Sequence, residues 1–133
     1  MKKRSFKVNY KEIKPDKTLR SEEGWINMIL RWVIDEEKMG SEFGVLGYTV
    51  FPPRGQHAPH IHKNAEEYVI VVKGHGISSS GGHEYKVGPG DVIFIPRGKP
   101  HYTKNTSDTE PLEIWFVYAG RPSLEKAGYK PVT

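Results

Sequence analysis

Three histidines and a glutamate are the residues whose types and spacing could do chemistry in this sequence. His60 and His62 are separated by one residue, so on a strand both imidazoles point to the same face, close enough to share an ion. Glu66 and Glu67 follow soon after, and His101 comes about 40 residues later, beyond two turns. Three neutral imidazoles and one carboxylate suit manganese, iron, cobalt, nickel, copper or zinc better than magnesium or calcium.

The alternative to a metal site is that these histidines are ordinary surface or core residues. For an isolated pair of histidines, that alternative would be the preferred interpretation. The sequence has no cysteine, which excludes disulfides, thiolate metal sites and cysteine nucleophiles. A metal site in this chain must therefore use histidine, carboxylate or other oxygen ligands. The larger pattern of turns and spacings around the histidines favours a metal site over the ordinary role.

The elements that must position these residues are short apolar runs, rich in β-branched residues and bounded by glycine and proline. The runs predict strands over residues 25–34, 45–51, 68–73, 83–87, 91–95, 101–105 and 112–118. Turn residues recur every 8–15 residues or so, as in an all-β sandwich or barrel. Helical periodicity is weak, and only residues 123–128 favour a helical turn, with Ser123 as its cap and Gly128 as its end.

The first predicted strand is apolar on both faces. One face carries Ile26, Met28, Leu30, Trp32 and Ile34. The other face is partly apolar because it carries Ile29 and Val33. Since exposed strands of this character tend to be covered, we predict a homodimer with residues 25–34 at or near the contact.

Two segments resemble the two sequence motifs of the cupin superfamily. The first is residues 55–67, followed by six residues and then Gly74. The second is residues 90–101, followed by three residues and then Asn105, and it matches the motif at every fixed position. The gap between Gly74 and Gly90 is short, as in small single-domain bacterial and archaeal cupins.

The resemblance implies an all-β fold, the double-stranded β-helix barrel or jelly roll. It implies a single cupin domain over residues 1–133, with a barrel core at about 25–120. In that family the motif histidines and glutamate bind one divalent metal ion inside the barrel. The implied metal ligands of this chain are His60, His62, Glu67 and His101.

The choice of Glu67 over Glu66 depends on register. Six residues separate Glu67 from Gly74, as they separate the family's glutamate from its glycine. A strand that begins at Glu67 also places Glu67, Val69 and Val71 on one face, so Glu66 would point away. Glu67 is therefore the predicted ligand.

Several other polar residues could contribute to the site. Tyr48, Tyr102 and Tyr118 are candidates for acid–base or hydrogen-bonding roles. Alternation turns Tyr102 away from the face of His101 and places Tyr118 on an apolar face of the strand over residues 112–118.

The remaining histidines and one asparagine have simpler interpretations. His75 and His83 are expected in loops, whereas His57 could lie near the site. Asn105 is expected to be a structural hydrogen-bonding residue rather than a ligand.

The predicted function is a metal-dependent enzyme. A bound ion can polarise a carbonyl, stabilise an enediolate or activate dioxygen, and similar cupins include dioxygenases, decarboxylases, isomerases and lyases. The family's usual glycine before the first histidine is Arg54 here, which could put a cation at the barrel mouth. Together with Arg97 and Lys99 it suggests a small oxygen-rich substrate, including anionic ones. The alternative is a metal-containing module that binds a small molecule without turnover, as auxin-binding cupins illustrate.

Charge and hydropathy limit the kinds of partner that we expect for this chain. The net charge is +4, and the early Lys and Arg residues are interpreted as a solvated segment rather than a nucleic-acid arm, because no nucleic-acid motif accompanies them. Neither an apolar signal region nor an apolar run of about 18 residues is present. We therefore expect a soluble cytoplasmic protein with no membrane or nucleic-acid partner.

Overall fold

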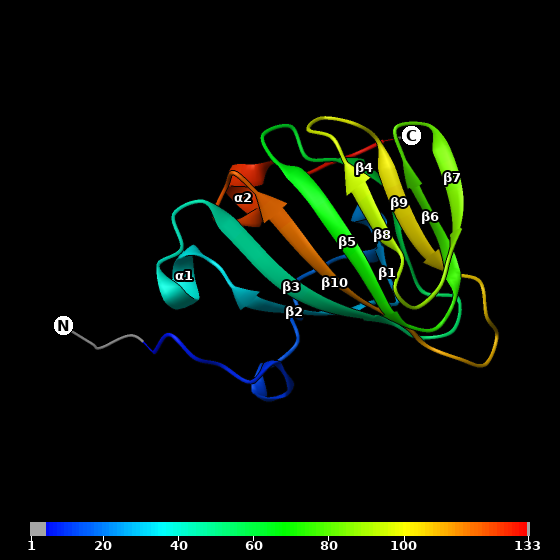
Figure 1. The fold of residues 1–133 in the computed structure, drawn as a ribbon, viewed down its shortest axis with the longest axis horizontal. Helices are drawn as coiled ribbons and strands as arrows, with labels where there is room; N and C mark the ends of the chain where they lie inside the picture. The colour runs from blue at the N-terminus through cyan, green and yellow to red at the C-terminus, as the bar shows by residue number, and fades with distance from the viewer. Residues whose placement is uncertain (1–4, 133) are drawn as a thin grey trace.

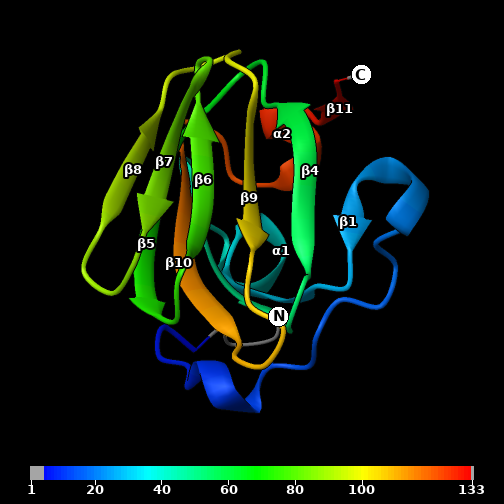
Figure 2. The same ribbon diagram turned by 90° about the vertical axis from the view of Figure 1, so that its right-hand side faces the viewer.

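Two antiparallel sheets face each other in the computed structural model, which describes residues 5–132 (Figures 1 and 2). The first sheet consists of β1 (Trp25–Ile26), β4 (Gln56–Ile61), β9 (His101–Asn105), β6 (Gly76–Ser80) and β7 (His83–Val87), in that order, with β11 (Lys130–Pro131) paired to β4. The second consists of β2 (Ile29–Ile34), β3 (Gly44–Phe51), β10 (Leu112–Ala119), β5 (Glu66–Lys73) and β8 (Val92–Ile95). This double-stranded β-helix confirms the predicted fold class.

The helical segments are short and lie outside the sheets. They are the 3₁₀ turns η1 (Tyr10–Glu12) and η2 (Ser21–Glu23) and the single-turn helices α1 (Glu36–Met39) and α2 (Leu124–Ala127). The prediction for residues 123–128 is confirmed, because the Ser123 hydroxyl accepts a hydrogen bond from the Lys126 amide and Gly128 ends α2. The basic residues Lys2, Lys3 and Arg4 lie outside the described residues. No helix within residues 5–132 is both long and apolar enough to cross a membrane.

The prediction of one strand over residues 25–34 is wrong. Asn27 has a φ of 50°, a left-handed conformation that asparagine tolerates better than most residues, and it breaks the extended chain. At this break the chain passes from one sheet, which β1 joins, to the other, which β2 joins. A further irregularity lies between Trp32 and Ile34, and Val33 between them is buried within its own chain.

Three strands of the described chain, β4, β6 and the short β11, were not among the predicted ones. β4 contains Pro59 and two histidines, and β6 is mostly serine, so neither has the apolar composition of a strand. Two of the buried serines of β6 have hydrogen-bond partners in nearby strands. Ser78 Oγ lies 3.0 Å from Thr103 Oγ1, and Ser80 Oγ donates to the Phe94 carbonyl at 2.7 Å.

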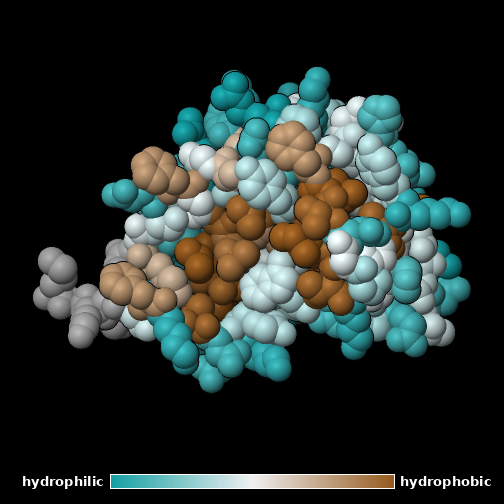
Figure 3. Space-filling model, viewed as in Figure 1, coloured by the Kyte–Doolittle hydropathy of each residue, from teal (hydrophilic) through white to brown (hydrophobic). Residues whose placement is uncertain are grey.

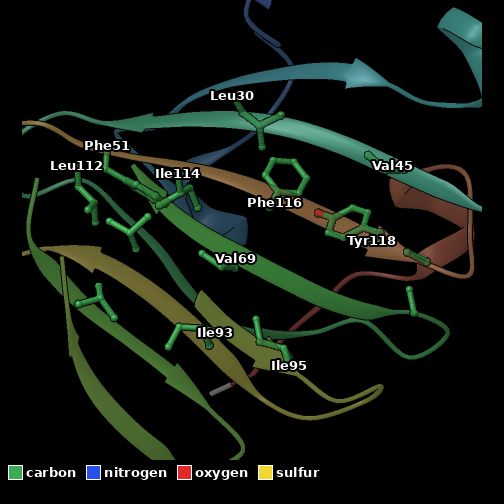
Figure 4. Close-up of a cluster of buried hydrophobic side chains, with 14 of the residues drawn as sticks. Leu30, Val45, Phe51, Val69, Ile93, Ile95, Leu112, Ile114, Phe116 and Tyr118 are labelled. Atoms are coloured by element: carbon green, nitrogen blue, oxygen red, sulfur yellow. The ribbon is translucent and has the colours of Figure 1, made fainter. Parts of the chain in front are cut away.

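The core fills the space between the sheets, and β10 lies at its centre (Figure 4). Its inward side chains are those predicted for this strand, namely Leu112, Ile114, Phe116 and Tyr118. The Phe116 ring lies directly against Gly47 of the adjacent β3, where an added Cβ would be 2.0 Å from the ring. A glycine in the middle of a strand is therefore required here by the close approach of an aromatic side chain.

The outer face of the second sheet is also apolar. Figure 3 shows a hydrophobic surface over the middle of this face. It comprises Tyr68, Ile70, Val92, Phe94, Trp115 and Val117. Val92 and Phe94 keep 63% and 53% of their surface exposed, whereas in β2 the exposed apolar residue is Ile29, at 36%. A sheet face exposed to water normally carries polar residues at alternate positions, so a partner is expected to cover this face.

The homodimer stays a prediction with a direct test. Light scattering at micromolar concentration should give about twice the chain mass of 15.1 kDa. Separate Ile29→Glu and Phe94→Glu variants should show which face makes the contact, because a buried carboxylate at the contact would dissociate the pair. A monomer mass for the unsubstituted protein would contradict the prediction.

Candidate metal centre

The four predicted ligands meet at one point inside the barrel. His60 lies at the end of β4, His62 directly follows that strand, Glu67 lies in β5 of the opposite sheet, and His101 begins β9. Register explains part of this meeting, because His60 pairs with His101 across β4 and β9. One ligand atom from each residue lies within 4.8 Å of all the others, and all four side chains are buried.

Backbone carbonyls fix the orientation of all three imidazoles. The Nδ1 atoms of His60, His62 and His101 lie 2.7, 2.6 and 3.0 Å from the carbonyl oxygens of Ala58, Gly128 and Lys99, respectively. A carbonyl can only accept, so each Nδ1 carries the hydrogen and each neutral ring presents the Nε2 lone pair to the centre.

The inward nitrogens are short of partners. Nε2 of His60 and Nε2 of His62 are buried with no hydrogen-bond partner within residues 5–132. The Glu67 Oε1 atom lies 3.0 Å from His101 Nε2 and 3.2 Å from His62 Nε2. Buried lone pairs that converge in this way are costly unless a cation binds them. The residues present therefore fit a divalent transition metal ion.

The charges of the cluster are coupled. Burial acts to raise the pKa of Glu67, but the adjacent imidazoles of His101 and His62 outweigh it and hold that pKa well below its usual range. Burial acts to lower the pKa of His101, but the Glu67 carboxylate outweighs it and raises that pKa. Burial, together with the neighbouring imidazoles, lowers the pKa of His60 well below its ordinary value. Without an ion, these shifts favour protonation of His101 over His60.

His57 lies against the cluster, as the sequence left open. Its ring stacks on His60 at a centroid distance of 3.6 Å and on Trp25 at 3.9 Å. Its Nε2 is 3.2 Å from the Tyr129 hydroxyl, which itself donates to the Glu23 carbonyl oxygen. Burial lowers the pKa of His57, so the ring is neutral and supports the ligand His60 by packing.

The C-terminal segment positions the ligands, and the sequence interpretation missed it. The Gly128 carbonyl holds His62, and the pair Lys130–Pro131 forms β11 against β4. The Val132 amide continues this contact by donating to the Pro59 carbonyl at 2.9 Å. These residues belong to no metal motif, and the contact between His62 and Gly128 joins positions 66 residues apart.

The three candidate tyrosines have different places. Tyr118 is buried in the barrel with its ring centroid 4.6 Å from that of His62, and burial, helped by the charge of Glu67, raises its pKa. Tyr102 points outward, as predicted, and donates to Glu84. Tyr48 is covered on the outer face and donates to Glu113 at 2.6 Å. Only Tyr118 of the three therefore lies beside the cluster.

Of the roles predicted for other polar residues, that of Asn105 is confirmed and that of Arg54 is not. The Asn105 side-chain nitrogen lies within 3.2 Å of the carbonyl oxygens of Phe51, Pro52 and Glu110, which confirms its structural role. Arg54 does not supply the cation that the sequence suggested for the barrel mouth. Arg54 binds Asp108 on the surface at 2.6 Å, beyond the end of β4 that is opposite to His60 and His62.

Comparison with known proteins identifies related chains. Residues 47–118 match the family described as the cupin domain. Oxalate oxidase GF-3.8 from Triticum aestivum is 37% identical over 82 residues, which are 56% of this chain and 37% of that protein. An uncharacterized protein from Aquifex aeolicus (strain VF5) is 31% identical over 117 residues, covering 86% of this chain and 92% of that one.

Solved structures give the same result. The structure of the polyketide cyclase RemF from Streptomyces resistomycificus superposes with a TM-score of 0.74 at 27% identity, covering 100% of this chain and 87% of that one. By contrast, the chain spans only 37–38% of the length of the first three curated relatives, two of which are wheat oxalate oxidases. The similarity to RemF thus extends over the whole of this chain, whereas the similarity to the wheat oxalate oxidases covers less than half of the length of those proteins.

Proposed function

This chain belongs to the cupin family, and from that premise we propose that it binds one divalent transition metal ion and acts on a small oxygen-rich molecule at that ion. The ligands are His60, His62, Glu67 and His101. The observation that carries the proposal is the convergence of three imidazole Nε2 atoms and one carboxylate oxygen in a buried site, two of these nitrogens having no other partner within the described residues.

The ion would supply Lewis-acid or redox chemistry, because four protein ligands leave one or two positions open to water or a substrate oxygen. The chain's own residues define those positions. Carbonyl groups hold the imidazoles in one tautomer, and the buried side chains around them exclude bulk water.

The reaction belongs to a dioxygenase, decarboxylase, isomerase or lyase type. Relatives named as an oxalate oxidase and a polyketide cyclase support an enzyme. The alternative is a cupin that holds its metal and binds a small molecule without converting it. The buried and fully oriented ligand set favours the enzyme, because preorganised ligands serve chemistry as well as binding.

The test starts from the metal. Protein purified without a metal-affinity step should contain close to one transition metal ion per chain by elemental analysis. The protein loaded with that metal is then screened for oxygen uptake and product formation on a panel of small carboxylates and diketones. Conversion of any of them supports the enzyme, and tight binding without conversion supports the alternative. Protein that retains no metal and takes up none would contradict both.

The two adjacent glutamates provide a matched pair for the ligand assignment. Glu67→Gln should weaken metal binding on the order of 10–100-fold, because it removes the negative charge that faces His101 and His62. Glu66→Gln should leave metal binding unchanged, since Glu66 accepts a hydrogen bond from the Tyr68 hydroxyl at 3.1 Å, outside the cluster. Isothermal titration with the same metal on both variants measures this difference, and a larger loss in Glu66→Gln would reverse the assignment.

A further inference from the structure

A small cavity adjoins the cluster, and its lining determines which side chains a molecule bound at the ion would contact. His60, Glu67 and His101 form one side of it, and its volume is about 20 Å³, enough for one or two water molecules. Most of the remaining wall is apolar and comes from Met28, Leu30, Phe51, Val69, Ile114 and Phe116. The uncharged groups of Thr49, Thr103 and Tyr118 add a few polar atoms.

The charge of this site is unbalanced by one unit. A divalent ion, three neutral imidazoles and one carboxylate sum to +1. Within residues 5–132, neither lysine nor arginine lines the cavity. A bound monoanion would bring the site to neutrality, whereas a dianion would leave one negative charge against an apolar wall with no cation to compensate it.

From this balance, and on the basis of the proposed function, we infer that the substrate is a monoanion that binds the ion through one carboxylate, or a carboxylate and a neighbouring oxygen, and turns an uncharged apolar group toward β2, β3 and β10. Small dianions such as oxalate are disfavoured. The same apolar wall that excludes a second charge contributes favourable burial for methyl or methylene groups.

Met28 determines the size of the molecule that enters. Of the residues that line the cavity in the described part of the chain, only Met28 and His57 are not fully buried, so they separate it from solvent. His57 is held by its stack and by Tyr129, whereas Met28 lies in the short link between β1 and β2, beside the left-handed Asn27. A methionine side chain has three rotatable bonds and can move to admit a ligand larger than the present cavity.

Charge selection is tested with pyruvate and oxalate, which both bind a metal through two oxygens but differ in their outer atoms. Each is titrated calorimetrically into protein of measured manganese content and into free manganese. The ratio of oxalate to pyruvate affinity should be lower on the protein by on the order of tenfold. An equal or higher ratio on metal-loaded protein would overturn the inference and leave the proposed function standing. Protein that takes up neither manganese nor any other divalent transition metal ion would instead overturn the proposed function.

Substitutions at Met28 test the residue itself, with circular dichroism and manganese content confirming each fold and site. Met28→Lys should restore oxalate binding about tenfold, and Met28→Leu, the matched control, should not. Met28→Ala should favour longer 2-oxo acids, about threefold to fourfold for each added methylene from pyruvate to 2-oxopentanoate, beyond any gain in the unsubstituted protein. An unchanged oxalate ratio in Met28→Lys, or the same chain-length profile in Met28→Ala and the unsubstituted protein, would overturn the role of Met28.

Discussion

Alanine at His60, His62 or His101 should remove nearly all bound metal while the barrel remains folded. Each substitution deletes one of four ligands, and its cost should exceed the ~10–100-fold that loss of an outer hydrogen-bond partner causes. The fold should survive because the buried apolar residues that form the core, among them those of β5, β8 and β10, all remain in place. Removing one imidazole also relieves the crowding of lone pairs in the metal-free protein.

Elemental analysis and circular dichroism on the three variants measure metal content and fold separately. His75→Ala and His83→Ala are matched controls, because both histidines are exposed and lie outside the cluster. These controls should retain full metal content. Full occupancy in all three cluster variants would show that the ion, if bound, lies elsewhere.

Metal affinity should fall steeply below about pH 6. Imidazole must be neutral to bind an ion, and its ordinary pKa is about 6.5. In the metal-free protein the Glu67 carboxylate raises the pKa of His101, so protons begin to compete there above the ordinary value. Burial and neighbouring rings lower the pKa of His60, so that residue takes up its proton at lower pH and adds to the loss. Release of one ion should therefore be accompanied by uptake of more than one proton.

Calorimetric titration of the metal-free protein between pH 5 and pH 8, in buffers of different ionisation enthalpy, measures both the affinity and the protons exchanged. Because the ion binds only the folded site, the thermal stability gained from metal should fall over the same range. A site with carboxylate ligands alone would keep its affinity until near pH 4. A flat affinity from pH 7 to pH 5 would contradict the histidine ligands.

The sequence by itself determined the features that follow from local periodicity. Alternation along a strand distinguished Glu67 from Glu66, turned Tyr102 outward and placed Tyr118 in the barrel. The caps of α2 were visible for the same reason, since a hydroxyl and a glycine act on residues only three or four positions away. The gathering of the four-residue cluster also followed from the spacing within two motifs.

The tertiary structure decided what depends on partners far along the chain. β4 and β6 form strands despite Pro59 and a run of serines, because neighbouring strands supply partners for their polar groups. The chain breaks at Asn27 because β1 and β2 belong to different sheets. Composition encodes preference for a conformation, and pairing across sheets can override it.

The surroundings of the four-residue cluster also depend on the tertiary structure. The Gly128 carbonyl holds His62, Trp25 and Tyr129 hold His57, and Arg54 binds Asp108 away from the cavity. None of these pairs is close in sequence, so no spacing rule could indicate them. The motif specifies which atoms converge. The packing of the two sheets decides how those atoms are oriented and which side chains a ligand contacts beside them. The reason is that the orienting contacts form only when segments distant in sequence lie together.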